Sequence, residues 1–195
     1  MILDRFKLDG KVALVTGPAT GLGRAMALAL AEAGADVAGL SSRHVDDVRD
    51  AVEERGRRYH PIRLDLSTAA PFDAERAVGE VIERLGRLDI LVNNAGINRR
   101  GPAIETDLDD FDAVMRVNVR GVFMLSRAAA GVMRAQGGGK IINVASMTSF
   151  TGSLNVSAYS TSKSAILGLT RSMANELAPF NVQVLNGKLF VTFAL

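Results

Sequence analysis

Apolar and polar positions follow each other along the chain in blocks that predict strands and helices in turn. Short runs rich in valine, isoleucine and leucine predict buried strands at residues 12–15, 37–40, 59–64, 88–92 and 140–145, and a sixth strand begins at 181–184. Longer segments rich in good helix formers predict helices at residues 22–33, 45–55, 72–85, 111–118, 119–135 and 158–177. Glycines at positions 34, 56 and 86 end three of these helices.

This alternation predicts the fold class. Parallel neighbours need a crossover connection, which a helix supplies, so the pattern favours an α/β fold with a doubly wound parallel sheet. Crossovers are right-handed, and helices are therefore expected on both faces of the sheet. Ligands of such sheets bind outside the carboxyl ends of the strands. The candidate motifs below all lie at those ends.

Composition narrows the class of protein. A chain of 195 residues that is 48% hydrophobic can form one domain with one good core. It has no cysteine and two histidines, so disulfides and thiolate metal sites are excluded, a reducing compartment is favoured, and no metal site is expected. The 23 basic residues are scattered among 21 acidic ones, which argues against a nucleic-acid partner. No apolar stretch of about 18 residues and no signal-like N-terminus is present, so a cytoplasmic protein without a membrane partner is expected.

A glycine-rich turn follows the first predicted strand. Small residues there let the backbone approach a pyrophosphate, whose charge is stabilised by the N–H groups at the start of the next helix. The spacing G-x-x-x-G-x-G also occurs in ordinary turns, but its position between a strand and an alanine-rich helix favours a dinucleotide site. The residues expected to contact the dinucleotide are Gly17, Thr20, Gly21, Leu22 and Gly23.

The end of the second strand leaves the nucleotide open. An acidic residue there binds the ribose hydroxyls of NAD, whereas a nearby arginine accommodates the phosphate of NADP. The sequence reads Leu40-Ser41-Ser42-Arg43, with no acid, and Ser42 and Arg43 become candidate contacts. Arg43 could equally be a solvated surface residue. Asp65 and Leu66 follow the third strand and could cover the adenine, although Asp65 could instead cap the next segment.

Tyr159 and Lys163 are the candidate catalytic pair. A free tyrosine is rarely ionised at pH 7, because its pKa is about 10. Residues four apart on a helix share a face, so the Lys163 ammonium can favour the ionised phenol. A phenol that gives and takes a proton near neutral pH suits interconversion of an alcohol and a ketone. Such pairs also occur on solvated helices, and Ser146 and Asn118 could be a loop cap and a helix-end amide.

Taken together, the motifs resemble the short-chain dehydrogenase/reductase family from about residue 7 to residue 184. The resemblance rests on the following pieces: Thr16-Gly17-x-x-x-Gly21-x-Gly23, Asn93-Asn94-Ala95-Gly96, Asn118, Ser146 and Tyr159-x-x-x-Lys163. It implies a Rossmann-like fold, binding of NAD or NADP, reversible carbonyl/alcohol conversion, and a homo-oligomer, either a dimer or a tetramer.

The resemblance also implies roles for single residues. Tyr159 would be the general acid/base, Ser146 would hydrogen-bond the substrate oxygen, and Lys163 would also hold the nicotinamide ribose. Asn118 would kink its helix and hold a water that relays protons to Lys163. Ala95, Gly96 and Asn93 would lie in the cofactor cleft; of Asn93 and Asn94, one lines the cleft and the other ties neighbouring strands together.

The substrate candidate comes from the segment after the Asn-Asn-Ala-Gly turn. Arg99 or Arg100 could bind a carboxylate at the mouth of the cleft, or either could be a loop charge paired with Glu105 or Asp107. The segments 1–6, 93–100 and 141–147 resemble the sugar-acid branch of the family, which includes 2-deoxy-D-gluconate 3-dehydrogenase and gluconate 5-dehydrogenase. The implied substrate is a sugar acid such as 2-deoxygluconate, 2-keto-3-deoxygluconate or gluconate.

The last residues depart from the family pattern. Residues 185–195 resemble the terminal strand of the family, as if the substrate-loop segment before it were missing, and too few residues remain for a parallel crossover. An internally shortened chain, a junction of non-contiguous pieces and a frameshifted tail all fit this pattern. The expectation is one dinucleotide-binding and catalytic domain over residues 1–195. The alternative function is a dinucleotide-binding or regulatory protein with little or no turnover.

Overall fold

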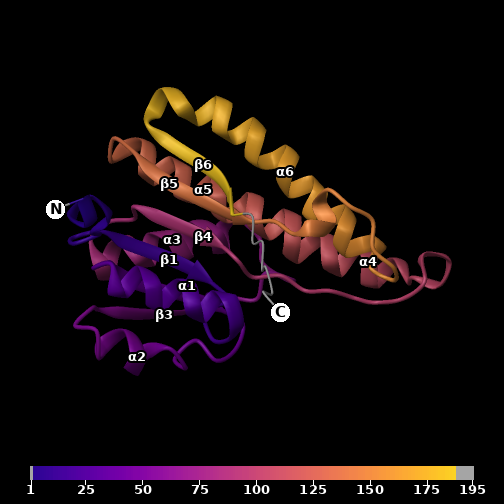
Figure 1. The fold of residues 1–195 in the computed structure, drawn as a ribbon, viewed down its shortest axis with the longest axis horizontal. Helices are drawn as coiled ribbons and strands as arrows, with labels where there is room; N and C mark the ends of the chain where they lie inside the picture. Colours follow the sequence, from indigo (N-terminus) through magenta and orange to yellow (C-terminus); the bar gives the residue numbers. More distant parts are fainter. Residues whose placement is uncertain (1, 188–195) are drawn as a thin grey trace.

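The computed structural model describes residues 2–187, which form a six-stranded sheet with helices on both faces (Figure 1). The strands are β1 (Val12–Thr16), β2 (Asp36–Ser41), β3 (Tyr59–Arg63), β4 (Ile90–Asn93), β5 (Gly139–Val144) and β6 (Val182–Gly187). Their order is β3-β2-β1-β4-β5-β6, and every neighbouring pair is parallel. This is the Rossmann order. Successive strands are added on one side of β1 as far as β3 and on its other side from β4 onward, so the strand order switches between β1 and β4. The predicted fold class is confirmed.

Within residues 2–187, six α-helices connect the strands. They are α1 (Gly21–Glu32), α2 (Arg49–Glu53), α3 (Pro71–Leu85), α4 (Leu108–Met115), α5 (Val122–Ala135) and α6 (Ser157–Leu177). Local signals fix their ends: Pro71 opens α3, the Asp73 side chain accepts a hydrogen bond from the Ala70 N–H, and Gly86 ends the helix in the left-handed conformation. Asp107 caps α4 by accepting from the Asp109 N–H at 2.8 Å.

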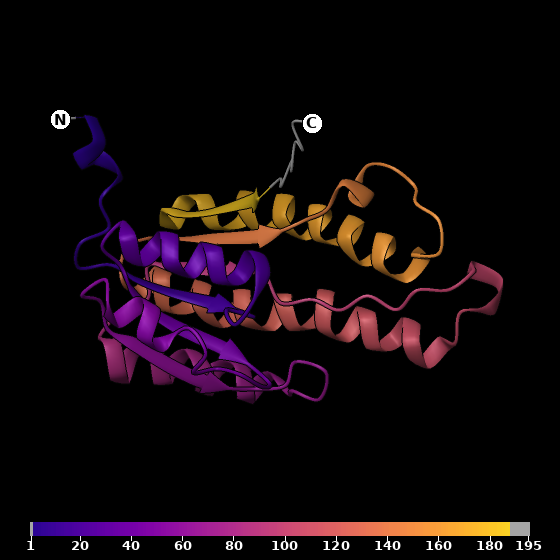
Figure 2. The same ribbon diagram turned by 60° about the horizontal axis from the view of Figure 1, so that its bottom comes forward.

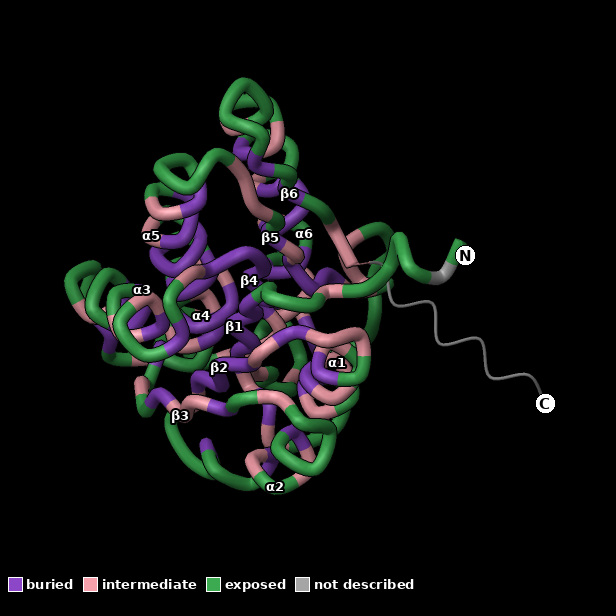
Figure 3. The backbone as a smooth tube through the Cα atoms, turned by 90° about the vertical axis from the view of Figure 1, so that its left-hand side faces the viewer, coloured by how far each residue is buried: buried purple, intermediate pink, exposed green. Residues whose placement is uncertain are grey.

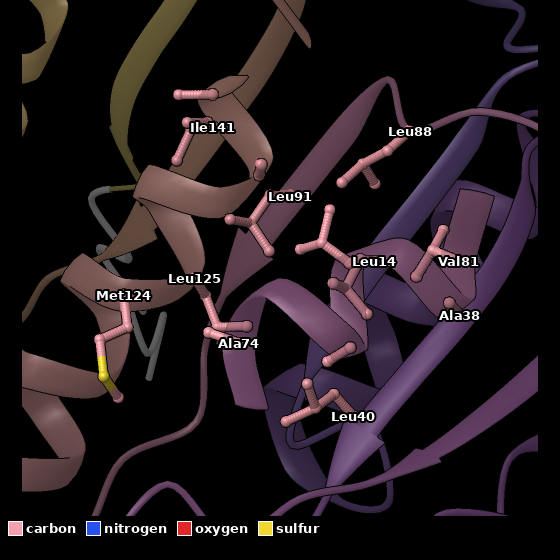
Figure 4. Close-up of a cluster of buried hydrophobic side chains, with 14 of the residues drawn as sticks. Leu14, Ala38, Leu40, Ala74, Val81, Leu88, Leu91, Met124, Leu125 and Ile141 are labelled. Carbon is pink, nitrogen blue, oxygen red and sulfur yellow. The ribbon is translucent and has the colours of Figure 1, made fainter. Parts of the chain in front are cut away.

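Two apolar layers lie on opposite faces of the sheet, as the alternation of side chains along each strand requires. Val12 and Leu14 of β1 pack with α3, α5 and α6, whereas Ala13 and Val15 pack with α1 and α2. Figure 4 shows the first layer, where leucines and an isoleucine of the sheet meet Val81 of α3 and Leu125 of α5. The strands are accordingly buried and the outer helix faces exposed (Figure 3).

All strands end at the same edge of the sheet, and long connections project beyond it. In Figure 2 the strand arrows point one way, and α4 and the first turns of α6 extend past their tips. The connections after β4 and after β5 meet there, because the Gly101 N–H donates to the Asn155 carbonyl at 3.0 Å and Gly101 forms an isolated bridge with Val156. This edge carries the candidate site.

Three predicted elements differ from the structure. The helix expected at 45–55 is only Arg49–Glu53, because the buried Val45 carbonyl accepts from the Tyr59 hydroxyl instead of a helical N–H. The strand expected at 88–92 begins at Ile90, since the Gln136 side chain binds both the N–H and the carbonyl of Leu88.

The third difference is the expected break between residues 118 and 119. The structure has a continuous helical run, in which a π-helical segment, Arg116–Gly121, joins α4 to α5. π segments interrupt the regular i to i+4 bonding of a helix. Asn118 lies in this segment and is fully buried.

The stretch that resembles a terminal strand is described only in its first three residues. Leu185, Asn186 and Gly187 continue β6 and pair with Ile142, Asn143 and Val144 of β5. Residues 188–195 lie outside the described part of the chain.

Candidate active site

A cleft of about 730 Å³ opens at the carboxyl edge, where the chain switches direction between β1 and β4. Most of the residues expected to contact a dinucleotide line it: Gly17, Thr20, Leu22, Gly23, Ser42, Arg43, Asp65, Leu66, Ala95 and Gly96. Several other lining residues are not predicted from the sequence, among them Ser41, Leu64, Ser67 and Ile97, and of the two asparagines Asn94 is the one that lines the cleft. Gly21 belongs to the same turn but does not line the cleft.

The glycine turn forms a close-fitting cradle. Gly17 adopts φ +65°, a left-handed conformation that favours glycine. A Cβ on Gly23 would overlap the carbonyl oxygen of Gly17, so the first turn of α1 can approach the β1 turn only because Gly23 has no side chain. The backbone at the start of α1 therefore faces the cleft directly. This geometry fits the pyrophosphate of a dinucleotide, with the helix N-terminus stabilising its charge.

Thr16 and Asn94 hold the turn against β4. The Thr16 hydroxyl, buried at the end of β1, accepts the N–H groups of Asn94 and Ala95 at 3.0 and 2.9 Å. The Asn94 amide donates to the carbonyls of Thr16 and Gly17 at 3.0 and 3.3 Å. The two strands that flank the cleft are thus fixed relative to each other.

Asn93 is not in the cleft, contrary to its assignment. It is 2% exposed, and its amide nitrogen donates to Ser126 of α5 at 2.9 Å and to Asn143 of β5 at 2.8 Å. Asn93 shares its side of β4 with Leu91, which faces the α3, α5 and α6 layer. The period of two along a strand was the available signal: it places Asn93 under α5 and leaves Asn94 at the cleft.

The wall of the cleft near β2 and β3 carries one positive charge, on Arg43, and one negative charge, on Asp65. Arg43 is exposed, and Asp65 accepts from the N–H and hydroxyl of Ser67 at 2.8 and 2.7 Å. The hydrogen bonds from Ser67 lower the pKa of Asp65, and the nearby Arg43 cation lowers it further. Burial raises it, but the net result is a pKa below the usual value. Asp65 therefore caps the following turn and also lines the cleft, and its contact with an adenine stays a prediction.

Lys163 lies behind the cleft, on the buried side of α6. It is 5% exposed, and its Nζ donates to the Val144 carbonyl at 2.7 Å. Burial lowers the pKa of Lys163 from 10.5 to about 8. At pH 7 the ammonium form still predominates, and it lies 5.8 Å from the centre of the Tyr159 ring. The cation therefore lies near the Tyr159 ring, and its effect on the phenol oxygen stays a prediction.

Asn118 and Gly96 connect Lys163 to the cleft. The Asn118 amide is paired at both ends: Oδ1 accepts the Ile97 N–H at 2.8 Å, while Nδ2 donates to the Ile97 carbonyl at 2.9 Å and to Ser162 at 3.0 Å. A Cβ on Gly96 would lie 3.1 Å from Asn118 Oδ1 and 3.7 Å from Lys163 Nζ. Because Gly96 lines the cleft, the ammonium group lies immediately behind its wall.

Ser146 follows β5 and opens a single 3-10 turn, Met147–Ser149. Its hydroxyl caps this turn, accepting from the Thr148 N–H at 3.2 Å and the Thr148 hydroxyl at 3.0 Å. The turn is attached to α6, because Ser149 Oγ donates to the Lys163 carbonyl at 2.9 Å. The segments that carry Ser146 and the Tyr159–Lys163 pair are thereby held together.

The two arginines proposed for the substrate differ in position. Arg99 lines the cleft, and its Nε lies 3.3 Å from Asp110 Oδ1. Its acidic partner is therefore Asp110 and not the expected Glu105 or Asp107. Arg100 is exposed and does not line the cleft.

The model of the family described as "short chain dehydrogenase" matches residues 11–188. The chain belongs to this family. The resemblance read from its motifs is confirmed. As a short-chain dehydrogenase, the protein is an oxidoreductase that uses NAD or NADP.

Several relatives of this short-chain dehydrogenase are named for a sugar acid or a polyol, and others are named 3-oxoacyl-[acyl-carrier-protein] reductase. A 2-dehydro-3-deoxy-D-gluconate 5-dehydrogenase of Escherichia coli strain K12 is 48% identical over 187 residues, which cover 94% of this chain and 72% of that protein. A solved gluconate 5-dehydrogenase of Burkholderia cenocepacia, in complex with NADP and tartrate, has a TM-score of 0.90 at 36% identity, covering 96% of this chain and 74% of that one. A solved NAD+-bound xylitol dehydrogenase has a TM-score of 0.89 at 36% identity, and the match covers 92% of this chain and 70% of that one.

The described residues form neither a cluster of metal ligands nor a membrane-spanning helix. Between residues 2 and 187, no three histidine, aspartate or glutamate side chains gather in a way that could hold a metal ion. Over the same residues, no helix is long and apolar enough to cross a bilayer.

The buried Lys163 makes a testable contribution to stability. Its pKa is lower in the folded protein, so between about pH 8 and pH 10.5 the unfolded chain binds more protons and stability rises with pH. Below pH 8 the full cost of burying the charge is present. Lys163→Met removes that cost, about 3 kcal/mol, and loses a hydrogen bond of about 1 kcal/mol, so the variant is expected to be about 2 kcal/mol more stable at pH 7.

Urea unfolding of parent and Lys163→Met without nucleotide measures this difference. The difference in unfolding free energy between the two proteins should shrink by several times RT as the pH rises to about 10, because only the parent carries the titrating group. A gap that does not change with pH would contradict the buried charge.

Proposed function

We propose that the protein interconverts a secondary alcohol and a ketone on a sugar acid, with 2-dehydro-3-deoxy-D-gluconate as the first substrate to test. The observation that carries the proposal is the buried Lys163 ammonium, placed beside the Tyr159 ring and directly behind Gly96 of the dinucleotide cleft. A buried cation at this place has a chemical use, because it favours the ionised phenol that an alcohol oxidation needs.

Four residues share the chemistry in this proposal. In oxidation, Tyr159 takes the hydroxyl proton of the substrate; in reduction, it returns a proton to the ketone oxygen. Ser146 donates a hydrogen bond to the same oxygen, and Lys163 holds its positive charge next to the phenol and binds the nicotinamide ribose. A bound nicotinamide supplies or accepts the hydride at the substrate carbon. Asn118 holds Ile97, and with it the wall in front of Lys163.

The substrate class is supported by the named relatives and by a cation at the cleft. The Escherichia coli relative is named for a sugar acid, and the Burkholderia structure contains tartrate, which is itself a hydroxy acid. Arg99 lines the cleft and pairs with Asp110 at the surface, a weak bond that a substrate carboxylate can replace. Arg100, one residue further, is the alternative.

Comparison of Arg99→Ala with Arg100→Ala tests the substrate class. Loss of a charge-assisted hydrogen bond to the carboxylate costs about 1.5–3 kcal/mol, so the variant at the binding position should raise KM about tenfold or more. The matching neutral sugar, which lacks the carboxylate, should show little change. If neither variant raises the KM for the sugar acid, or if the KM for the acid and for the neutral sugar rise equally, the arginines do not bind the carboxylate.

The nucleotide proposal is NADP, or both nucleotides, on account of Arg43. Ser41 ends β2, and it lines the cleft together with Ser42 and Arg43; no acidic side chain at this strand end is available to bind ribose hydroxyls or to repel a phosphate. Arg43→Ala is expected to weaken NADP binding about tenfold or more and to leave NAD binding within about twofold. Titration calorimetry with both nucleotides measures this; equal changes for the two would make Arg43 a surface charge only.

A homo-oligomer is also proposed. The outer surface of the α4–α5 run has a hollow of about 550 Å³, lined by Asp112, Met115, Arg116, Val119, Arg120 and Phe123. It is mainly apolar with both signs of charge, so a second copy in an antiparallel orientation could pair Asp112 with an arginine. Light scattering should give a multiple of the monomer mass, and Phe123→Glu should reduce it. A monomeric parent would contradict the proposal.

A further inference from the structure

The turn after β5 places a second hydroxyl on the proposed catalytic serine. Thr148 contacts Ser146 Oγ twice, through its backbone N–H at 3.2 Å and through its own hydroxyl at 3.0 Å. In the first contact the Thr148 N–H is the donor, and the second contact joins two hydroxyls. Ser146 and Thr148 are both half-buried, so water is partly excluded from this pair.

A serine hydroxyl has one proton to donate and two lone pairs that can accept. The Thr148 N–H occupies one acceptor position of Ser146, and the Thr148 hydroxyl fills the other when it donates to Ser146 Oγ. The hydrogen-bonding capacity that remains to Ser146 is that of a donor. This is what a ketone oxygen requires, since a carbonyl oxygen can only accept.

We propose that Thr148 is a positioning residue that fixes the Ser146 hydroxyl as a donor to the reacting oxygen. The inference rests on the proposed function, in which Ser146 contacts that oxygen. A Ser146 with an open lone pair could accept the phenol proton of Tyr159, the same proton that must reach the substrate. By filling that lone pair, Thr148 keeps Ser146 and Tyr159 as two separate donors to one oxygen.

The position of the turn does not depend on the Thr148 hydroxyl. Ser149 Oγ accepts the Ser146 N–H at 3.2 Å and donates to the Lys163 carbonyl at 2.9 Å, and Ser164 Oγ donates to the Ser149 carbonyl at 3.3 Å. Removing the Thr148 hydroxyl therefore leaves the attachment of the turn to α6 intact. Its effect should be confined to the orientation of Ser146.

Thr148→Val keeps the shape of the side chain and removes the hydroxyl. We expect kcat to fall about five- to tenfold, as for loss of one hydrogen bond in the transition state, with KM and nucleotide affinity within about twofold. Thr148→Ser restores the hydroxyl and should restore kcat. Thr151→Val is the matched control, because the Thr151 hydroxyl in the same loop donates to the Met147 carbonyl and does not contact Ser146; its kcat should not change.

A double-mutant cycle separates positioning from a general structural effect. In a Ser146→Ala background, Thr148→Val should have no further effect on kcat, since Thr148 acts only through the serine. An equal fall in both backgrounds, an unchanged kcat in Thr148→Val, or failure of Thr148→Ser to recover would each overturn the proposal.

A second readout does not need turnover. Crystal structures of parent and Thr148→Val should show one Ser146 rotamer in the parent and a second rotamer in the variant. A single, unchanged rotamer would overturn the positioning role. Absence of turnover in the parent would instead overturn the proposed function, so the two failures are distinguishable.

Discussion

Replacing Tyr159 with phenylalanine is expected to lower kcat by about a hundred- to ten-thousandfold, the usual contribution of a positioned general acid or base. The change removes one oxygen and keeps the ring that lies 5.8 Å from Lys163 Nζ. Packing on α6 and the glycine cradle are untouched, so NAD and NADP should bind within about twofold of the parent. The expected signature is a protein that binds nucleotide and does not turn over.

Steady-state rates followed by nicotinamide absorbance, together with nucleotide titrations, measure the two parts of this prediction. A matched control is Tyr59→Phe, because the Tyr59 hydroxyl binds the Val45 carbonyl in the layer that packs with α1 and α2, and its loss should affect stability more than chemistry. Turnover by Tyr159→Phe within about tenfold of the parent, a barrier change of about 1.4 kcal/mol, would remove Tyr159 from the mechanism.

Gly23→Ala is expected to have the second large effect, on nucleotide binding. The added methyl would overlap the Gly17 carbonyl oxygen. This oxygen belongs to the main chain, so it cannot move aside as the end of a flexible side chain could. The turn must move apart from α1, which costs about 1–3 kcal/mol of folding stability, as overpacking of this kind usually does. The displaced cradle should weaken both NAD and NADP at least tenfold, about 1.4 kcal/mol.

Gly168→Ala is the control for this substitution. Gly168 lies in α6, and an added Cβ would meet no atom within 4 Å. Alanine there should stabilise the helix by about 0.5–1 kcal/mol without changing nucleotide affinity. If Gly23→Ala bound both nucleotides as tightly as the parent, the cleft would not be a dinucleotide cradle of the kind described.

The alternation of strands and helices could be predicted from the sequence because both elements depend on local patterns. Strand ends and helix lengths were less certain, since they depend on contacts from distant parts of the chain. Val45 is kept out of α2 by Tyr59, and Leu88 is kept out of β4 by Gln136. In the π segment the Asn118 amide pairs with Ile97, 21 residues away, and no local pattern signals this contact.

The site shows the same division. The glycine turn and the Tyr159–Lys163 spacing are local, and the structure puts them where the patterns indicate. Asn93 was assigned to the cleft from its motif alone, whereas strand alternation places it under α5. The contacts of Thr148 with Ser146 and of Arg99 with Asp110 depend on side-chain geometry that the sequence does not carry.

The most direct test of the account is the rate of nicotinamide reduction by the parent protein with 2-dehydro-3-deoxy-D-gluconate, measured with NAD and with NADP. The account predicts turnover with at least one nucleotide, loss of that turnover in Tyr159→Phe, and a much lower kcat/KM for a neutral sugar of the same length. Tight nucleotide binding without turnover on any sugar acid would contradict it and would favour a dinucleotide-binding protein that is not an enzyme.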